Sequence, residues 1–298
     1  MRVFLINILC LLACAHVAAQ QKQPFATVEL SGGYQVANLH WSIAGKVNGA
    51  PVNVLSEVKW SDLSGPTFNA TLQLHPAKQI FIGAALTRSF IKSGNATDTD
   101  YGDNDRSATT YHAQLNSDEG SLQTCRLYGG YYFLQQRKWQ VAAMMGYTNN
   151  KAWLYLLNHA AEVPGQKNLR STYSTTWKGI TGGIIGNYHA TSWLAISADA
   201  QYSQVAYRAV ADWNLIDAFQ HPISFTQRAN GFDLRMAVSS VFKLNHYLAL
   251  FITGTYQHAE TGYGTDELFL ASGAVQTTRF NGAFTGAKQI AIGTRMQF

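Results

Sequence analysis

The chain has 298 residues, which is enough for one large β domain or two small ones. Hydrophobic residues make up 47% of it and charged residues only 13%, about half the usual charged fraction. This composition disfavours an ordinary soluble enzyme and suits a barrel with one apolar and one polar face. The net charge of +5 comes with no cluster of basic residues, so we expect no nucleic-acid partner.

The first nineteen residues read as a secretory signal peptide. Arg2 supplies the positive start, residues 3–15 form an apolar stretch too short for a stable membrane anchor, and Ala19 ends a plausible cleavage site. A competing interpretation takes residues 11–14 as a lipoprotein box. With the signal removed, Cys125 is the one remaining cysteine, so no intrachain disulfide is expected.

From about residue 25 onward, hydrophobic and polar residues alternate. Within residues 232–242, Phe232 and Met236 share one face with other apolar residues, whereas Asp233 and Arg235 lie on the opposite face. Residues 194–203 and 289–298 show the same contrast. A charge facing lipid is costly at the bilayer midplane, so the charged face must line the inside of a barrel.

The links between these segments are unequal in length. Short and long links at alternate ends are typical of outer-membrane barrels. The predicted short links are residues 75–78, 134–138, 189–192 and 243–246, and the predicted long ones are about 46–53, 93–110, 158–172, 212–222 and 262–279. Ten strands follow, at about residues 25–45, 52–74, 79–92, 111–133, 138–157, 173–188, 193–211, 223–242, 247–261 and 280–298.

The pattern therefore predicts an all-β protein, a ten-stranded antiparallel transmembrane β-barrel, formed as a single domain by residues 20–298. Phe298 ends an alternating last strand, which resembles the signal read by the outer-membrane assembly machinery. We expect a monomer in the outer membrane of a Gram-negative bacterium. An even number of strands puts both termini in the periplasm and the long loops outside the cell.

Most motifs that carry chemistry are missing. The sequence has no HExxH, no CxxC and no P-loop, so it predicts no metal and no cofactor. The acidic stretch at residues 93–105 is the exception. Asp98 and Asp100 are two residues apart, which puts both carboxylates on one face of an extended segment, roughly 6–7 Å apart. Such a pair can share a proton or order a water. The alternatives are a solvated acidic loop or a weak cation site.

This stretch resembles one family. Residues 80–85 (IFIGAA) and 94–103 (GNATDTDYGD) are similar to the third strand and second loop of the omptins, which are ten-stranded outer-membrane endopeptidases. The omptin pattern there is a strand ending in IGAA, followed by GN-x-x-D-x-D-aromatic-x-D. Weaker similarity extends to residues 56–60, 145–147, 180–188 and 293–298. On these motifs the chain is identified as a divergent omptin.

The resemblance implies a catalytic group. Asp98 and Asp100 match the Asp pair of omptins, in which a water between that pair and a second couple, Asp-x-His, attacks the peptide carbonyl. Asp212 matches the second Asp, but Asn214 stands where the family has His. A neutral amide cannot act as a general base, and losing a base costs ~10²–10⁴-fold. His221 is the alternative base, paired with Asp212 or, in a shifted alignment, with Asp217.

Two further family features are altered. Omptins prefer basic peptides because acidic residues line their specificity pocket, but Val210 stands at the matching position here. Cleavage between basic residues is therefore not predicted. Omptins bind lipopolysaccharide through Tyr-x-Glu-x-Arg, and the run here is Tyr147, Asn149 and Lys151. The resemblance implies lipid contact at Tyr147 and Lys151, although Lys lacks the bidentate fork of Arg.

The leading hypothesis is an omptin-like aspartic endopeptidase that cleaves exposed peptides or proteins at the cell surface, with its catalytic His replaced by Asn214. The alternative is a catalytically degenerate barrel that keeps the scaffold as a surface-binding or structural protein. A small pore ranks third, because side chains can largely fill the interior of a ten-stranded barrel.

Overall fold

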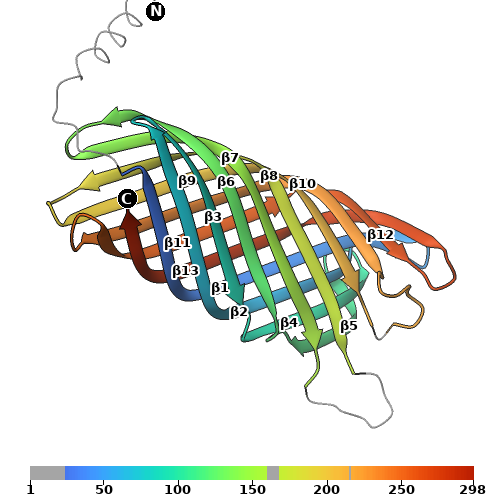
Figure 1. Ribbon diagram of the computed structural model, residues 1–298. Coiled ribbons are helices and arrows are strands. Elements are labelled where there is room, and N and C mark those ends of the chain that lie inside the picture. Colours follow the sequence, from blue (N-terminus) through green and yellow to red (C-terminus); the bar gives the residue numbers. More distant parts are fainter. Residues whose placement is uncertain (1–23, 160–167, 215) are drawn as a thin grey trace, which may run out of the picture.

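The computed structural model describes residues 24–159, 168–214 and 216–298, so the predicted signal peptide lies outside the described residues. These residues form one antiparallel sheet of thirteen strands (Figure 1). The strands are β1 (Ala26–Val47), β2 (Ala50–Ala77), β3 (Ile80–Phe90), β4 (Ser93–Asp103), β5 (Ser107–Asn116), β6 (Gly120–Gln135), β7 (Trp139–Leu157), β8 (Arg170–His189), β9 (Leu194–Asp212), β10 (Phe225–Lys243), β11 (Leu248–Thr261), β12 (Gly264–Phe269) and β13 (Val275–Gln297).

Thirteen strands make a ten-membered ring because three members of the ring are interrupted. β3 and β4 form the first interrupted member, because both pair with β2, along successive stretches of it. β6 and β5 form the second, because β6 pairs with β3 and β5 pairs with β4. β11 and β12 form the third, because both lie between β10 and β13. Counting each interrupted pair once gives 13 − 3 = 10. β1 pairs with both β2 and β13 and closes the ring. The predicted ten-stranded antiparallel barrel is confirmed.

The predicted boundaries were wrong at one end of the barrel. Residues 93–110 and 262–279 were expected to be loops, yet they contain β4, the turn after it, the first four residues of β5, β12 and the start of β13. These segments carry polar residues on both faces, so they lack the contrast that marks a strand crossing lipid. Cross-strand pairing holds them instead, for example Asp98 opposite Val58 of β2.

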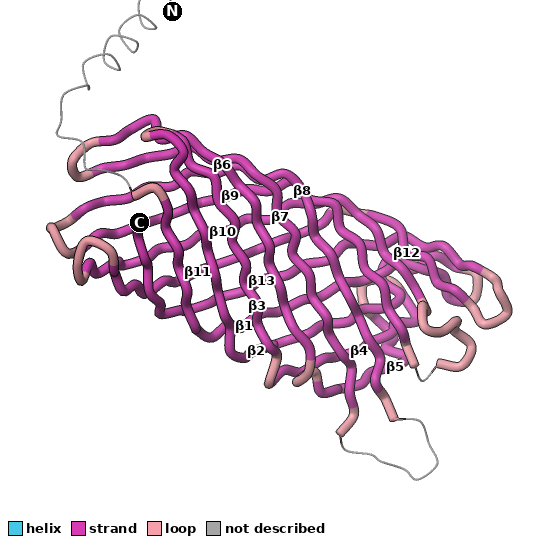
Figure 2. Tube along the Cα trace, in the orientation of Figure 1, coloured by secondary structure: helices cyan, strands magenta, loops and turns pink. Residues whose placement is uncertain are grey.

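The two ends of the barrel differ. β1 begins and β13 ends at the same end, where Thr27 pairs with Gln297 and the four predicted short links lie (Figure 1). We call this the terminus end and the opposite end, which carries β4, β5 and β12, the loop end. The strands run obliquely along the whole length between them (Figure 2). No helix among the described residues is long and apolar enough to cross a membrane.

The alternation of side chains separates an apolar outside from a packed inside. Asp233 is 4% exposed and faces inward, where it accepts hydrogen bonds from Asn150 and Gln257, which confirms the predicted luminal face. Arg235 pairs with Asp199 at 2.5 Å beside it. Large apolar side chains stay exposed on the outer surface, among them Leu72, Ile82, Leu127, Met145, Ile180, Met236, Ile252 and Ile292.

Aromatic side chains fill the interior toward the loop end. Tyr173 is fully buried, and its ring lies 5.0 Å from that of Trp60 and 5.8 Å from that of Trp41. Trp213 and Phe225 join the same group at 4.8 Å from each other. We call these five residues the aromatic plug. The aromatic plug closes the barrel interior and forms the floor of the space at the loop end.

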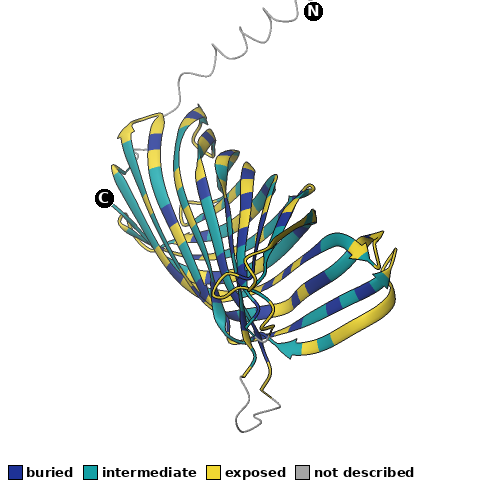
Figure 3. Cartoon of the chain, turned by 90° about the vertical axis from the view of Figure 1, so that its right-hand side faces the viewer, coloured by how far each residue is buried: buried dark blue, intermediate teal, exposed yellow. Residues whose placement is uncertain are grey.

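Above this floor the barrel wall opens into two lobes. β5 meets β7 at a single pair, Asn116 with Leu157, and the pairing of β1 with β13 stops at Ile43 opposite Phe280. The ends of β1 and β2, together with β4 and β5, therefore form a first lobe that projects away from the remaining strands (Figure 3). The ends of β7 to β10, β12 and β13 form the second lobe.

Candidate functional site

The predicted acidic pair lies on the inner face of the first lobe. β4 runs between β2 and β5, with Asp98 opposite Val58 on one side and Ala113 on the other. Asp98 and Asp100 share a face of β4 with Ala96, which packs into the luminal core. Both carboxylates share one face of the strand, as their spacing predicted, and that face points into the space above the aromatic plug.

Burial changes the acidity of both groups. Burial and, to a lesser degree, the neighbouring charge of Asp100 raise the pKa of Asp98 to about 7, and a hydrogen bond from the Trp213 side chain opposes that rise. Burial also raises the pKa of Asp100, against a hydrogen bond from Ser56. Near neutral pH, Asp98 is therefore protonated in about half of the molecules. The pair can hold a shared proton at physiological pH.

Asp212 pairs with His221, the alternative base that the sequence offered. His221 Nδ1 lies 2.6 Å from Asp212 Oδ1, so the segment after β9 folds back and brings the two side chains together. Asp212 shares a face of β9 with Arg208 and Val210, whereas Tyr207 and Ala211 on the other face pack into the luminal core. The Asp212–His221 couple thus lies on the outer side of β9 and does not share the face to which Asp98 points.

Trp213 occupies the inner side at this level. It is 8% exposed, packs on Trp41 and Phe225, and comes near enough to Asp98 to lower the pKa of that carboxyl. Its side chain therefore links the second lobe to the first at the acidic pair. Sequence reasoning missed this residue, although the charged face predicted to line the barrel holds Asp199 and therefore the odd-numbered positions of this strand.

Asn214 is engaged in structural contacts. Its side-chain oxygen accepts a hydrogen bond from the Arg170 backbone at 2.9 Å and one from Ser171 Oγ at 3.3 Å, and its nitrogen donates to the Asn168 carbonyl at 2.9 Å. These bonds tie the end of β9 to the start of β8. Both polar atoms of the amide are used within the second lobe.

The predicted lipid-contact residues lie on the outer surface. Tyr147 is 46% exposed, and the ammonium of Lys151 and the guanidinium of Arg88 lie 6.0 and 4.9 Å from the centre of the Trp153 ring. Cross-strand pairing places Lys151 in one row with further basic residues, through Gln123, Thr176 and Thr265. We call this the basic row: Arg88, Lys151, Arg208, Arg228 and Arg279.

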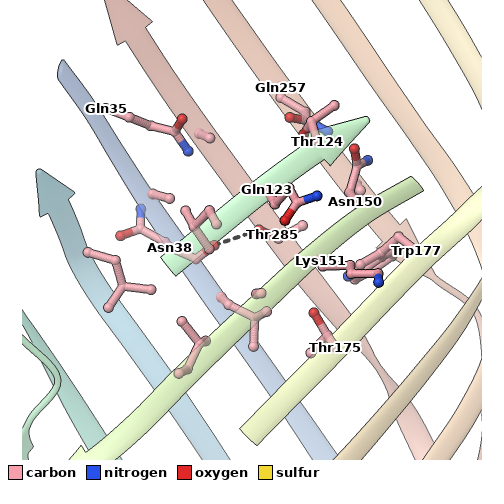
Figure 4. Close-up of a pocket in the computed structure, with 18 residues that line it drawn as sticks. Gln35, Asn38, Gln123, Thr124, Asn150, Lys151, Thr175, Trp177, Gln257 and Thr285 are labelled. Carbon is pink, nitrogen blue, oxygen red and sulfur yellow. Dashed lines mark hydrogen bonds between the residues drawn. The ribbon is translucent and has the colours of Figure 1, made fainter. Parts of the chain in front are cut away.

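A separate cavity lies inside the barrel beneath the plug. Asn38, Asn150, Thr175 and Gln257 contribute polar atoms to its wall, and Trp177 contributes an aromatic one (Figure 4). Its volume of about 60 Å³ would hold roughly four waters. Thr175 is 2% exposed, and its hydroxyl has no protein partner among the described residues, which fits a solvated chamber. No group of three His, Cys, Asp or Glu side chains in the described part of the chain could hold a metal.

Comparison with known proteins adds a family and a fold. A family model described as Protochlamydia outer membrane protein matches residues 29–298. The comparison with curated proteins found no match. Among solved structures, the outer membrane protease OmpT from Escherichia coli is similar with a TM-score of 0.74 and 13% identity, over 95% of this chain and 100% of that one.

Other outer-membrane structures are similar to a lesser degree. The translocator domain of the autotransporter NalP from Neisseria meningitidis has a TM-score of 0.40 at 10% identity, over 100% of this chain and 96% of that one. The outer membrane protein OprG from Pseudomonas aeruginosa has a TM-score of 0.40 at 10% identity, over 94% and 99%. At 13% identity the likeness to OmpT establishes the shared fold only. The function has to be inferred from the residues on the inner face of the two lobes.

Proposed function

Because this chain belongs to the Protochlamydia outer membrane protein family and forms a barrel of the outer membrane, we propose that it is a surface-binding protein that keeps the fold of OmpT without a working peptidase site. The space between the two lobes is its binding region. Its acidic pair serves to bind and to hold the lobes in place, and no peptide bond is broken there.

The buried position of Trp213 on the inner side of β9, packed on Trp41 and Phe225, is the observation that carries this proposal. A peptidase of the kind first hypothesised needs a general base facing the acidic pair, close enough to take a proton from one intervening water. The buried indole of Trp213 stands on that face instead, packed against Phe225 and near enough to Asp98 to lower the pKa of that carboxyl. An indole N–H is only a donor, so it cannot act as the base.

The position of Asn214 supports the same conclusion. Its amide is used by Arg170, Ser171 and Asn168, so its contacts explain the residue without a catalytic role. The imidazole of His221 could accept a proton, but it is bonded to Asp212 on the outer side of β9.

The peptidase hypothesis keeps one observation in its favour. Asp212 and His221 form a close carboxylate–imidazole couple, the arrangement that orients a general base, and Asp212 directly precedes the residue that touches Asp98. For this couple to serve the acidic pair, Trp213 would have to leave the aromatic plug. Such a movement would separate a packed aromatic cluster, which makes it the less favoured arrangement.

A cleavage assay decides between the two. The protein is refolded in detergent with lipopolysaccharide and incubated with a diverse peptide library from pH 5 to pH 9, beside OmpT as a positive control. We expect no cleavage by the wild type, Asp98→Ala, Asp100→Ala or His221→Ala proteins. Cleavage by the wild type that disappears in Asp98→Ala and His221→Ala would establish the peptidase and refute the proposal.

A further inference from the structure

The four short links at the terminus end contain no Asp or Glu. Two of them, the link from β2 to β3 and the link from β6 to β7, carry three exposed cations, Lys78, Arg137 and Lys138. We call these three residues the basic rim. No acidic residue occurs in residues 63–97 or 120–157, so the strands that carry the basic rim supply no carboxylate of their own on this half of the barrel.

Hydrogen bonds join the two links that carry the basic rim. The Tyr132 amide donates to the Gln79 carbonyl at 2.8 Å, and the side-chain nitrogen of Gln135 donates to the Lys78 carbonyl at 2.8 Å. The Tyr131 hydroxyl donates to the Gln79 side-chain oxygen, also at 2.8 Å. The backbone under the three cations is therefore held as one edge, so an anionic group that binds there does not have to order a loop first.

Exposed aromatic side chains lie directly beside the basic rim. Trp139 follows Lys138 in the chain, is 49% exposed, and its ring centre lies 4.4 Å from that of Tyr188. Tyr131 is 48% exposed on the outer side of β6. Trp and Tyr concentrate at the boundary between membrane and water, at the level of the lipid headgroups. The basic rim therefore lies among the headgroups of the leaflet at the terminus end.

The spacing along β7 supports this level. Lys138 and Lys151 of the basic row are thirteen residues apart, which is roughly 43 Å along a strand. At a strand tilt of about 45°, this distance spans roughly 30 Å across the membrane, the thickness of its hydrocarbon core. Between the two lysines, the exposed side chains of Trp139, Met145 and Tyr147 carry no charge. The basic rim and the basic row therefore mark the two edges of the apolar band.

We propose that the basic rim binds anionic phospholipid, with the lipid phosphate on Arg137, Lys138 and Lys78 and the acyl chains along the exposed side chains of Ile80 and Trp139. The guanidinium of Arg137 can hold two phosphate oxygens at once, and the lysines add positive charge. This surface is separate from the space between the lobes, so the inference goes beyond the proposed binding function and does not depend on it.

Phospholipid fits this surface better than a soluble acidic partner does. A lipid brings its phosphate to the cations and its acyl chains to the apolar and aromatic side chains beneath them, whereas a soluble partner satisfies only the cations. A zwitterionic headgroup carries its own cation next to the phosphate and gains less from the rim. The site should therefore distinguish lipids by headgroup charge.

The test is native mass spectrometry of the full-length protein, refolded in nonionic detergent and titrated with phosphatidylglycerol or phosphatidylcholine that have identical acyl chains. We expect phosphatidylglycerol to bind at least tenfold more tightly. The double variant Arg137→Gln with Lys138→Gln should lower the affinity for phosphatidylglycerol by roughly tenfold and leave that for phosphatidylcholine nearly unchanged. Equal binding of both lipids by the wild type would overturn the proposal in favour of a soluble acidic partner.

A matched double variant removes the same charge from the other edge of the apolar band. Lys151→Gln with Arg208→Gln changes two side chains of the basic row and should bind phosphatidylglycerol as the wild type does. All four substitutions lie on the outer surface, so circular dichroism should show the same barrel in both variants. An equal loss of phosphatidylglycerol binding in the two double variants would also overturn the proposal, because it would show a general effect of net charge.

Tryptophan fluorescence locates the bound lipid. Lipids with brominated acyl chains quench nearby indoles, and brominated phosphatidylglycerol should quench the wild type more than brominated phosphatidylcholine does. That excess should disappear in Trp139→Phe. It should remain in Trp193→Phe, which removes another exposed indole at the terminus end. An excess that survives Trp139→Phe would place the lipid elsewhere and refute the assignment to the basic rim.

Discussion

The two acidic groups at the loop end differ in which side of the barrel wall they face. Asp98 and Asp100 of the first lobe lie over the aromatic plug, where burial raises the pKa of both. Asp212 of the second lobe lies on the outer side of β9 and pairs with His221 at 2.6 Å. A shift of one residue along a strand reverses the face of every side chain. Residues that match a catalytic motif in sequence need not meet in space.

This comparison depends first on Trp213, which occupies the inner side of β9. We predict that Trp213→Ala lowers the free energy of unfolding by roughly 3–5 kcal/mol, because it removes a large aromatic side chain from a packed cluster. Chemical denaturation in detergent measures the change. Trp213→Phe keeps an aromatic ring in the cluster and loses the indole N–H near Asp98, so its cost should be clearly smaller. Equal stability of Trp213→Ala and wild type would mean that the plug is not packed as described.

The second prediction concerns the buried acid itself. The pKa of Asp98 rises from its ordinary value of 3.8 to about 7 on folding, so the unfolded chain releases this proton at lower pH than the folded one. Stability should therefore fall between about pH 4 and pH 7 and level off above, by roughly 4 kcal/mol at most.

Asp98→Asn keeps the shape and cannot ionise, so it should be the more stable protein above pH 7 and should lack this part of the pH dependence. Unfolding midpoints from pH 4 to pH 9 test both statements. A wild-type profile that is flat, or that rises over this range as it would for a carboxylate stabilised by folding, contradicts the assignment. Asp212→Asn, on the outer side of β9, is the matched control, and it should keep the part of the pH dependence that Asp98 contributes.

The sequence predicted the barrel well where lipid enforces a contrast between faces, as in residues 232–242. It failed at β4, at the start of β5 and at β12, because polar residues stand on both faces there and pairing alone decides their structure. It correctly placed Asp98 and Asp100 on one face. It did not predict that Asp212 faces outward, although counting forward from Asp199, on the charged face predicted to line the barrel, would have shown it. The distance between His221 and Asp212 depends on a fold-back that no local pattern encodes.

A third prediction tests how the first lobe is held. Glu57 is 3% exposed and binds Arg106 at 2.8 Å and Lys59 at 2.6 Å, which fixes the turn between β4 and β5 against β2. Arg106→Ala should cost about 1–3 kcal/mol, because it leaves the buried carboxylate with one partner fewer. Limited proteolysis should then cut near residues 104–108. Arg279→Ala, an exposed residue of the second lobe, should leave this turn protected.

A fourth, smaller effect concerns the outer surface, where we propose that the basic row contacts the anionic groups of lipopolysaccharide. Lys151→Gln and Arg208→Gln should each weaken binding by about 1 kcal/mol, an effect that added salt reduces. Titration of detergent-solubilised protein with lipopolysaccharide measures it. Arg137→Gln removes a charge from the short link between β6 and β7 at the terminus end. Equal loss in that control would show a general charge effect without a site.

The last prediction is that placing the omptin-like His at position 214 does not produce peptidase activity. Asn214→His should give no peptide cleavage, because the side chain at this position is held by Arg170, Ser171 and Asn168 within the second lobe. It should instead cost about 1 kcal/mol of stability through the loss of some of these bonds. The double variant Asn214→His with Trp213→Ala opens the inner face as well.

Cleavage by the single variant in the peptide-library assay would show that the identity of residue 214 alone limits activity. Cleavage by the double variant only would show that Trp213 blocks a site that is otherwise intact. If neither variant cleaves any peptide, the difference from OmpT lies in the outward placement of Asp212, which no single side-chain substitution can reverse.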